Sequence, residues 1–468
     1  MERNSRLLCQ IVKVLLTISV IAVLAACGST PDQEVATSTP AATGTPTLAP
    51  SPTERSPTLA PTLSPAVTPT TTPSGVTPTT TPLSTFAPTR TVQGSPAIGS
   101  EILFLRDNTL VAYNLDNGQE RSIAPQVRMF AAAPDGRRLA LIREIEQAVD
   151  IWLVERDGSD LRPITNNANI EGELSWAPDG QAIAYTETEA ARQYDLDWES
   201  WSRWCSTSAV QLHDLTSQTT ITLGQGCNPA FAPDGRRIAF ATAPEAADDA
   251  MPSAANAIHL VNRQGENGWD FAEASPDSED SDSGLIVYAP AWSPDSAQLA
   301  YQRFIGYRAL VDINLTEMGD SYVGDGQLLG AGAGWLHPPI FSPDGNRMAL
   351  IENNFSDARG FGGYETWQAQ VLRLNEAGEV FLPDGTRQTS ATQVDRLFRA
   401  TAAAWSPDSN ALVVALPSGW SADTPTTEPI YTNIGPSEIW RWTPGQAPSE
   451  RLAVGIDFAS PLAWLPPL

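Results

Sequence analysis

Short apolar segments separated by polar turns fill the chain from about residue 99 to its end. Typical segments are Ile102–Leu105, Leu110–Asn114, Arg138–Ile142 and Ile238–Ala241, each four or five residues long. Segments of this length, bounded by turn-forming residues, predict β-strands rather than helices. We therefore expect residues 99–468 to form an all-β domain.

A five-residue motif precedes many of these segments and occurs six times. It consists of an aromatic or small residue, then Ala or Ser, then Pro-Asp-Gly or Pro-Asp-Ser. Successive copies lie about 44 to 64 residues apart, a period typical of propellers. The aspartates of the six copies are Asp135, Asp179, Asp234, Asp295, Asp344 and Asp408.

Each part of the motif helps to reverse the chain. Pro presets φ for the first central position of a turn, Asp suits the second, and Gly supplies a positive φ. The Asp side chain can also accept hydrogen bonds from nearby backbone N–H groups. The residue before the turn is expected to end an inner strand and to pack between sheets. We therefore interpret the six aspartates as structural.

In these repeats the chain resembles the TolB-like propellers, which are relatives of the WD-repeat proteins. The resemblance covers about residues 99–468 and implies a β-propeller built from four-stranded blades. The α/β domain that precedes the propeller in TolB has no counterpart in this sequence. The resemblance therefore does not extend to that protein's import role.

The two ends of the domain predict how many blades it has. Glu101 begins three strands that lack a preceding first strand, and Trp464-Leu465-Pro466 matches a first strand with nothing after it. A blade shared between the two ends would leave no free sheet edge. We therefore predict a seven-bladed propeller closed by this shared blade, with six blades as the alternative.

The N-terminal residues predict export and a lipid anchor. Residues 1–26 combine a basic start with a short apolar run and read as a signal peptide. The run ends in Leu24-Ala25-Ala26-Cys27, which resembles the bacterial lipobox and implies lipidation of Cys27. A plain signal peptide with a chance cysteine, or an N-terminal membrane anchor, is the alternative. Acyl chains at Cys27 would hold the protein on the extracytoplasmic side of a membrane in the bacterial cell envelope.

Residues 27–98 are rich in Pro and Thr and predict a disordered tether. About half of this stretch is one of these two residue types, and it contains runs such as Thr70-Thr71-Thr72-Pro73. Such a composition cannot bury enough apolar surface to offset chain entropy. We therefore assign it a spacing role between the lipid and the propeller.

The longest insertions are predicted to share one face of the propeller. They follow a second strand or precede a first strand, as in 187–205, 244–256, 353–366 and 417–437. The Pro-Asp-Gly turns are expected on the opposite face. We call the face that carries the long insertions the long-loop face. Elaborated loops on a rigid scaffold are the usual place for binding. Neutral variation of surface loops is the alternative.

Two cysteines and two groups of aromatic residues fall on this face. Cys205 is expected to start a third strand and Cys227 to enter the next first strand, so we predict a disulfide between them. The aromatic groups either bind a sugar or protein partner or pack locally beneath the disulfide, and packing is the interpretation we favour. The candidate binding residues are Asp195, Asp197, Trp198, Trp201, Trp204, Phe361, Tyr364 and Trp367.

Charge and motifs argue for binding without catalysis. The chain has 54 acidic and 28 basic residues, a formal net charge of −26, which disfavours a nucleic-acid partner. It contains no Gly-x-Ser-x-Gly elbow and no phosphate-binding glycine loop. Its histidines, His213, His259 and His337, lie in different repeats, and the acidic run from Asp277 lacks the full spacing of a calcium loop. We therefore predict no metal and no cofactor.

The sequence as a whole predicts a monomeric, membrane-anchored propeller that binds an envelope or extracellular protein, or a glycan, without catalysis. The alternative is a propeller hydrolase or lyase acting on an extracellular polysaccharide or peptide. A pair of carboxylates about 5–10 Å apart in the channel, with a shifted pKa, would favour this alternative.

Overall fold

The computed structural model describes residues 98–189, 198–243, 256–274, 286–304, 310–317, 327–333, 335–356, 364–374, 376, 378–381, 387–390, 393–421 and 436–468. The signal peptide, Cys27 and the tether lie outside these residues, so they stay predictions. The described residues belong to the unit Thr91–Leu468. They are almost entirely β-strand, with one short helix, α2 (Trp198–Ser206), of about two and a half turns. No helix among them is long and apolar enough to cross a membrane.

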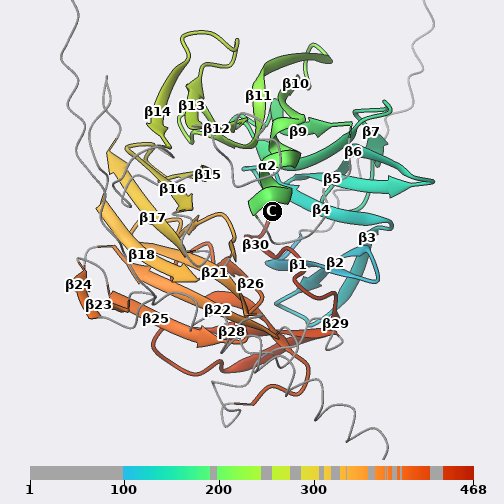
Figure 1. The fold of residues 1–468 in the computed structure, drawn as a ribbon. Coiled ribbons are helices and arrows are strands. Elements are labelled where there is room, and N and C mark those ends of the chain that lie inside the picture. The colour runs from blue at the N-terminus through green and yellow to red at the C-terminus, as the bar shows by residue number, and fades with distance from the viewer. Residues whose placement is uncertain are drawn as a thin grey trace, which may run out of the picture. The chain divides into compact units, whose positions relative to one another are not determined.

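The strands form antiparallel sheets that follow one another along the chain (Figure 1). The first sheet has the order β3-β2-β1-β30, and the next strands are β4 to β7. The bounds are β1 Glu101–Arg106, β2 Thr109–Asn114, β3 Glu120–Ala124, β4 Val127–Ala132, β5 Arg138–Ile145, β6 Ala148–Glu155, β7 Arg162–Pro163 and β30 Ala463–Leu465.

One long strand links the next two sheets. The first part of β11 pairs with β10, and its second part, from Gly226, pairs with β12. Gly226 has a φ of 146°, and a Cβ there would lie 2.1 Å from the carbonyl oxygen of Ala241. Only glycine therefore fits where β11 passes between the sheets. The bounds are β8 Ile170–Trp176, β9 Ala182–Thr188, β10 Ser208–Asp214, β11 Thr219–Phe231, β12 Ile238–Thr242, β13 Ala257–Val261 and β14 Trp269–Glu273.

The C-terminal half continues the pattern. Its sheets have the orders β15-β16-β17-β18, β19-β21-β22-β25 and β26-β27-β28-β29, while β20 pairs with β21 and β23 with β24. The bounds are β15 Ile286–Trp292, β16 Gln298–Phe304, β17 Leu310–Glu317, β18 Gln327–Ala333, β19 Trp335–Leu336, β20 Ile340–Phe341, β21 Arg347–Ser356, β22 Tyr364–Arg373, β23 Gly378–Phe381, β24 Arg387–Ser390, β25 Gln393–Phe398, β26 Ala402–Trp405, β27 Leu412–Pro417, β28 Ser437–Trp442 and β29 Glu450–Ile456.

This strand order is that of a β-propeller, and the expected closure of its ends is confirmed. β30 pairs antiparallel with β1 through Leu465 opposite Glu101, Trp464 opposite Ile102 and Ala463 opposite Leu103. The number of blades stays a prediction, because the pairings join β4 to β14 in one continuous path.

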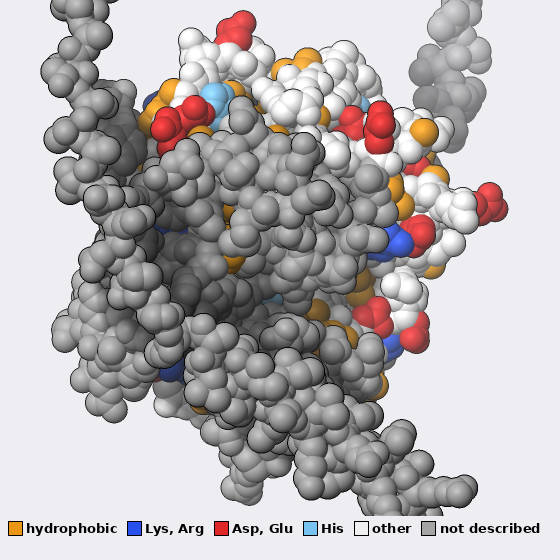
Figure 2. All heavy atoms as spheres, in the orientation of Figure 1, with side chains coloured by type: hydrophobic (Ala, Val, Ile, Leu, Met, Phe, Trp, Pro, Cys, Tyr) orange, Lys and Arg blue, Asp and Glu red, His pale blue; other side chains and the backbone are white. Residues whose placement is uncertain are grey.

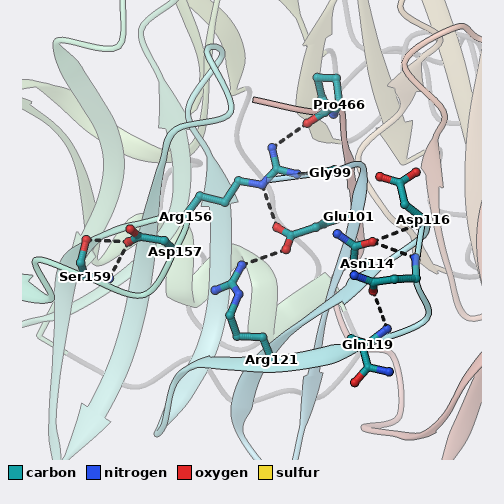
Figure 3. Close-up of polar contacts among 11 residues, drawn as sticks. Gly99, Glu101, Asn114, Asp116, Gln119, Arg121, Arg156, Asp157, Ser159 and Pro466 are labelled. Carbon is teal, nitrogen blue, oxygen red and sulfur yellow. Dashed lines mark hydrogen bonds and ion pairs between the residues drawn. The ribbon is translucent and has the colours of Figure 1, made fainter. Parts of the chain in front are cut away.

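A buried arginine fastens this closure to the following sheet (Figure 3). The Arg156 side chain donates from Nε to Glu101 Oε2 at 2.8 Å, from Nη1 to the Pro466 carbonyl at 2.6 Å and from Nη2 to the Gly99 carbonyl at 2.9 Å. Arg121 donates to the other Glu101 oxygen at 2.9 Å. Arg156 is only 1% exposed, so a buried side chain joins both ends of the domain. We call these contacts the closure clamp.

The six motif turns have the predicted geometry. In each copy the Asp Oδ1 accepts from the backbone N–H two residues later, at 2.8 to 3.2 Å. The last motif residue has a positive φ in every copy, including Ser296 at 59° and Ser409 at 63°. These serines also bridge turns, because their hydroxyls accept from the backbone N–H groups of Asp234 and Asp344, respectively, in the preceding repeat.

The motif tryptophans pack between sheets, as expected. The Nε1 groups of Trp176, Trp292 and Trp405 each donate at 3.0 Å to a carbonyl in the preceding repeat. An arginine that follows the preceding turn lies over each indole ring, at 5.0 to 5.8 Å from its centroid. These arginines are Arg138, Arg237 and Arg347.

Candidate functional site

The described strand ends agree with a long-loop face for three of the four predicted insertions. The expectation for 353–366 was wrong in its bounds, because β21 and β22 stay paired as far as Ser356 and Tyr364. The connections from β9 to β10, β12 to β13 and β27 to β28 span 19, 14 and 19 residues, whereas each motif turn connects its strands within a few residues. The first and second strands of each sheet are antiparallel, as are the second and third. The long connections therefore leave from the side opposite the motif turns.

The predicted disulfide joins Cys205 to Cys227, whose Cα atoms lie 5.3 Å apart. The expected place of Cys205 was wrong, because it lies in α2 and not at the start of β10. Cys227 lies in the second part of β11, as expected for a first strand. The disulfide therefore fixes α2 to the sheets beneath it.

The two described tryptophan side chains of α2 belong to the core. Trp201 is 2% exposed and Trp204 is 7% exposed, and both pack in the cluster that contains the disulfide. The Trp201 ring lies 5.5 Å from that of Tyr288 on β15. This matches the packing interpretation favoured from the sequence, because neither indole face is open to a ligand.

Of the remaining aromatic and acidic candidates, only Trp367 has a described side chain. Trp367 is buried, and its ring lies 5.7 Å from that of His337 and 5.6 Å from that of Phe458. Trp198 lies in α2 and Tyr364 begins β22, but their side chains are outside the described residues. Asp195, Asp197 and Phe361 also lie outside them.

A group of three carboxylates lies near the start of β8, and the sequence did not single it out. Glu171 of β8 is directly opposite Glu187 of β9. The Asn167 Nδ2 group donates to Glu171 Oε1 at 3.1 Å and to Glu187 Oε1 at 2.9 Å, so these two oxygens lie within about 6 Å of each other. Asp150 of β6 accepts from the Asn167 backbone N–H at 3.3 Å. We call Asp150, Asn167, Glu171 and Glu187 the acidic cluster.

Burial makes Glu171 the unusual member of the cluster. It is 2% exposed, and its Oε2 has no hydrogen-bond partner. Burial, followed by the nearby charges of Asp150 and Glu187, raises the pKa of Glu171 to about 8. Glu171 therefore carries a proton at neutral pH. Burial, followed by the nearby charges of Glu187 and Glu171, raises the pKa of Tyr185.

The cluster can hold and release a proton, but its geometry does not suit a metal. Among the described residues, no group of three His, Cys, Asp or Glu side chains is arranged to hold a metal ion. None of the three carboxylates has an ion-pair partner in the described part of the chain. On the face seen in Figure 2, the coloured acidic side chains are spread out rather than gathered in one patch.

The only sequence signal for this cluster was weak. Glu171 directly follows Ile170 at the start of the strand that leads to Trp176, a place where an apolar residue is ordinary. Asn167 lies only four residues before Glu171, whereas Asp150 and Glu187 lie on other strands. Only the pairing of β8 with β9 and β6 brings them together.

Comparison with known proteins finds only distant structural similarity. No family model and no curated protein matches it. TolB from Acinetobacter baumannii is 15% identical, with 78% of this chain and 81% of that chain covered and a TM-score of 0.38. An oligogalacturonate lyase from Vibrio parahaemolyticus is 13% identical, with 66% and 80% covered and a TM-score of 0.45.

A functionally unknown protein from Desulfotomaculum acetoxidans is 13% identical, with 78% of this chain and 98% of that chain covered and a TM-score of 0.46. In fold the chain is a β-propeller, as its strand pairings show, and its repeats resemble those of the TolB-like propellers. The values carry no conclusion about activity, and the fold itself rests on the strand pairings described above.

Proposed function

We propose that this protein is a lipid-anchored, extracytoplasmic propeller that binds a protein partner through its long-loop face. The observation that carries the proposal is the contrast between the two faces. Every motif turn is short and braced by its aspartate, whereas three of the second-to-third strand connections span 14 to 19 residues. Variable loops on a rigid scaffold are where binding residues concentrate.

The scaffold beneath these loops is rigid for identifiable reasons. Tryptophan hydrogen bonds and arginine stacking fix neighbouring sheets to each other, and the disulfide fixes α2. A preorganised surface loses little conformational entropy on binding, which favours recognition of a folded partner.

Photo-crosslinking from the two faces tests the proposal. A crosslinking amino acid is placed at Ala168, which is exposed on the long-loop side, or at Arg236, which is exposed in a motif turn. The domain 99–468 is then incubated with the envelope fraction of the source bacterium. We expect discrete crosslinked proteins from position 168 and none from position 236.

A matched variant shortens the connections 243–256 and 418–436 to tight turns. We expect it to lose the crosslinks while its thermal unfolding stays cooperative. Equal crosslinking from both faces, or crosslinks only from position 236, would reject the proposal.

One observation favours a second candidate, a hydrolase or lyase. Glu171 is protonated at neutral pH and lies within about 6 Å of Glu187, an arrangement that suits general acid–base chemistry on a glycoside. The near-complete burial of Glu171 weighs against it, because a substrate must reach the proton. Turnover of a polysaccharide panel that disappears in the Glu171→Gln variant would favour this candidate over simple binding.

A further inference from the structure

The connection before β8 is bonded to Glu171 through Asn167, and it is held both by the acidic cluster and by backbone bonds from Ile164 and Thr165 to the Ile151 carbonyl. It runs from the end of the two-residue strand β7 to the start of β8, and its residues 166–168 are exposed. Thr165 Oγ1 lies 3.5 Å from Asp150 Oδ1 and accepts from the Ile151 N–H at 2.7 Å. Asn167 contributes the three bonds to the carboxylates. We call residues 164–169 the covering segment.

Burial and nearby negative charges raise the pKa of Glu171, and hydrogen bonding from Thr165 and from the Glu171 backbone offsets this rise only in part. Asp150 faces Glu171 from β6, and Glu187 and Tyr185 face it from β9. The Arg143 side chain of β5 donates to the Pro125 carbonyl and lies over the Trp152 ring. The other elements packed on β8 offer no free cation, because Arg128 of β4 pairs with Glu144 and β11 carries no charged residue.

We propose that the acidic cluster is a proton-controlled latch. The proton on Glu171 keeps the covering segment bonded to Asp150, Glu171 and Glu187 on the long-loop face. The unpartnered, buried Oε2 of Glu171 is the oxygen that must hold a proton or be reached by water. When that proton is lost, a buried charge lies beside two other carboxylates. The covering segment is exposed at 166–168 and bonds Glu171 through Asn167, so we expect water to reach the carboxyl when this segment opens.

The direction of the effect follows from proton linkage. Glu171 binds its proton more tightly when the segment is closed, because opening exposes the carboxyl and returns its pKa toward the ordinary value of 4.5. Closure is therefore strongest below about pH 4.5. Opening becomes about tenfold more favourable for each pH unit up to about 8, and it changes no further above that.

The effect on partner binding rests on the proposed function, whereas the latch itself does not. A partner that recognises the closed covering segment would bind more weakly as the pH rises. The test below uses the free domain alone, so the latch and the proposed function can fail independently.

Hydrogen exchange of the domain 99–468, corrected for the intrinsic rate at each pH, tests the latch. In wild type we expect the protection of the amides of Ile151, Thr165 and Asn167 to fall about tenfold per unit between pH 5.5 and 7.5. The fall should level off above about pH 8. In Glu171→Gln the same amides should show constant protection.

The matched control is Glu155→Gln. Burial is the largest cause of the raised pKa of Glu155, at the other end of β6. This variant should keep the wild-type slope at the covering segment. A carbon-13 titration of the Glu171 carboxyl in wild type serves as a second measurement and does not depend on folding of a variant. Flat protection in wild type, an unchanged slope in Glu171→Gln, or an ordinary Glu171 titration would overturn the proposal.

Discussion

The closure clamp gives the sharpest stability prediction. Arg156→Met keeps most of the side-chain volume and removes three hydrogen bonds, one of them to a carboxylate. Glu101 is then left buried with only Arg121, and the carbonyls of Gly99 and Pro466 lose their donor. Removing one partner of a buried ion pair typically costs about 3–5 kcal/mol. We expect a loss of that size, a large share of the roughly 5–15 kcal/mol that stabilises a typical domain.

Urea unfolding of the domain 99–468, followed by tryptophan fluorescence and circular dichroism together, measures this loss. Coincidence of the two signals checks that the transition is two-state. Arg121→Met is the control, because Arg121 is 35% exposed and gives Glu101 one bond, so it should cost about 1 kcal/mol or less. The reasoning is refuted if Arg156→Met costs no more than Arg121→Met.

Three further predictions concern the disulfide, the core and the motif turns. Replacing Cys205 and Cys227 by Ala should lower the free energy of unfolding by about 3 kcal/mol, measured in urea, and added reductant should then have no further effect. Trp201→Ala should cost about 3–5 kcal/mol in the same assay, because it empties a buried site; a loss near zero would restore a binding role for this ring. The hydrogen bond from Ser406 lowers the pKa of Asp408, so Asp408→Asn should destabilise the domain at pH 7. That difference should disappear as the pH falls below the ordinary value of 3.8, and a difference that persists at pH 2 would argue against this cause.

Much of the scaffold was predictable because its determinants are local. A Pro-Asp-Gly turn needs only its own backbone. The other copies of the motif therefore adopt the same geometry as Asp135 and Gly136. The shared closing sheet was predictable because unpaired apolar strands at both ends have few other ways to bury themselves. The disulfide followed from the expected placement of two strands, even though Cys205 lies in a helix.

The acidic cluster and the clamp were not predictable, because each depends on strand pairings that no local sequence pattern specifies. Glu101 and Arg156 are 55 positions apart, and Pro466 is 310 positions beyond Arg156. Neither Glu101 nor Arg156 belongs to the repeated motif. Their burial became visible only once the sheets were placed side by side.

The sequence by itself determined the repeat, its turns, its strands and the ring-like closure, because these follow from backbone preference and from the need to bury apolar residues. The tertiary structure alone decided which polar side chains lose water. It assigned Trp201 and Trp204 to the core, made Arg156 the link between the chain ends and raised the pKa of Glu171. The physical reason is that desolvation depends on every neighbour in space, and a local sequence pattern does not specify those neighbours.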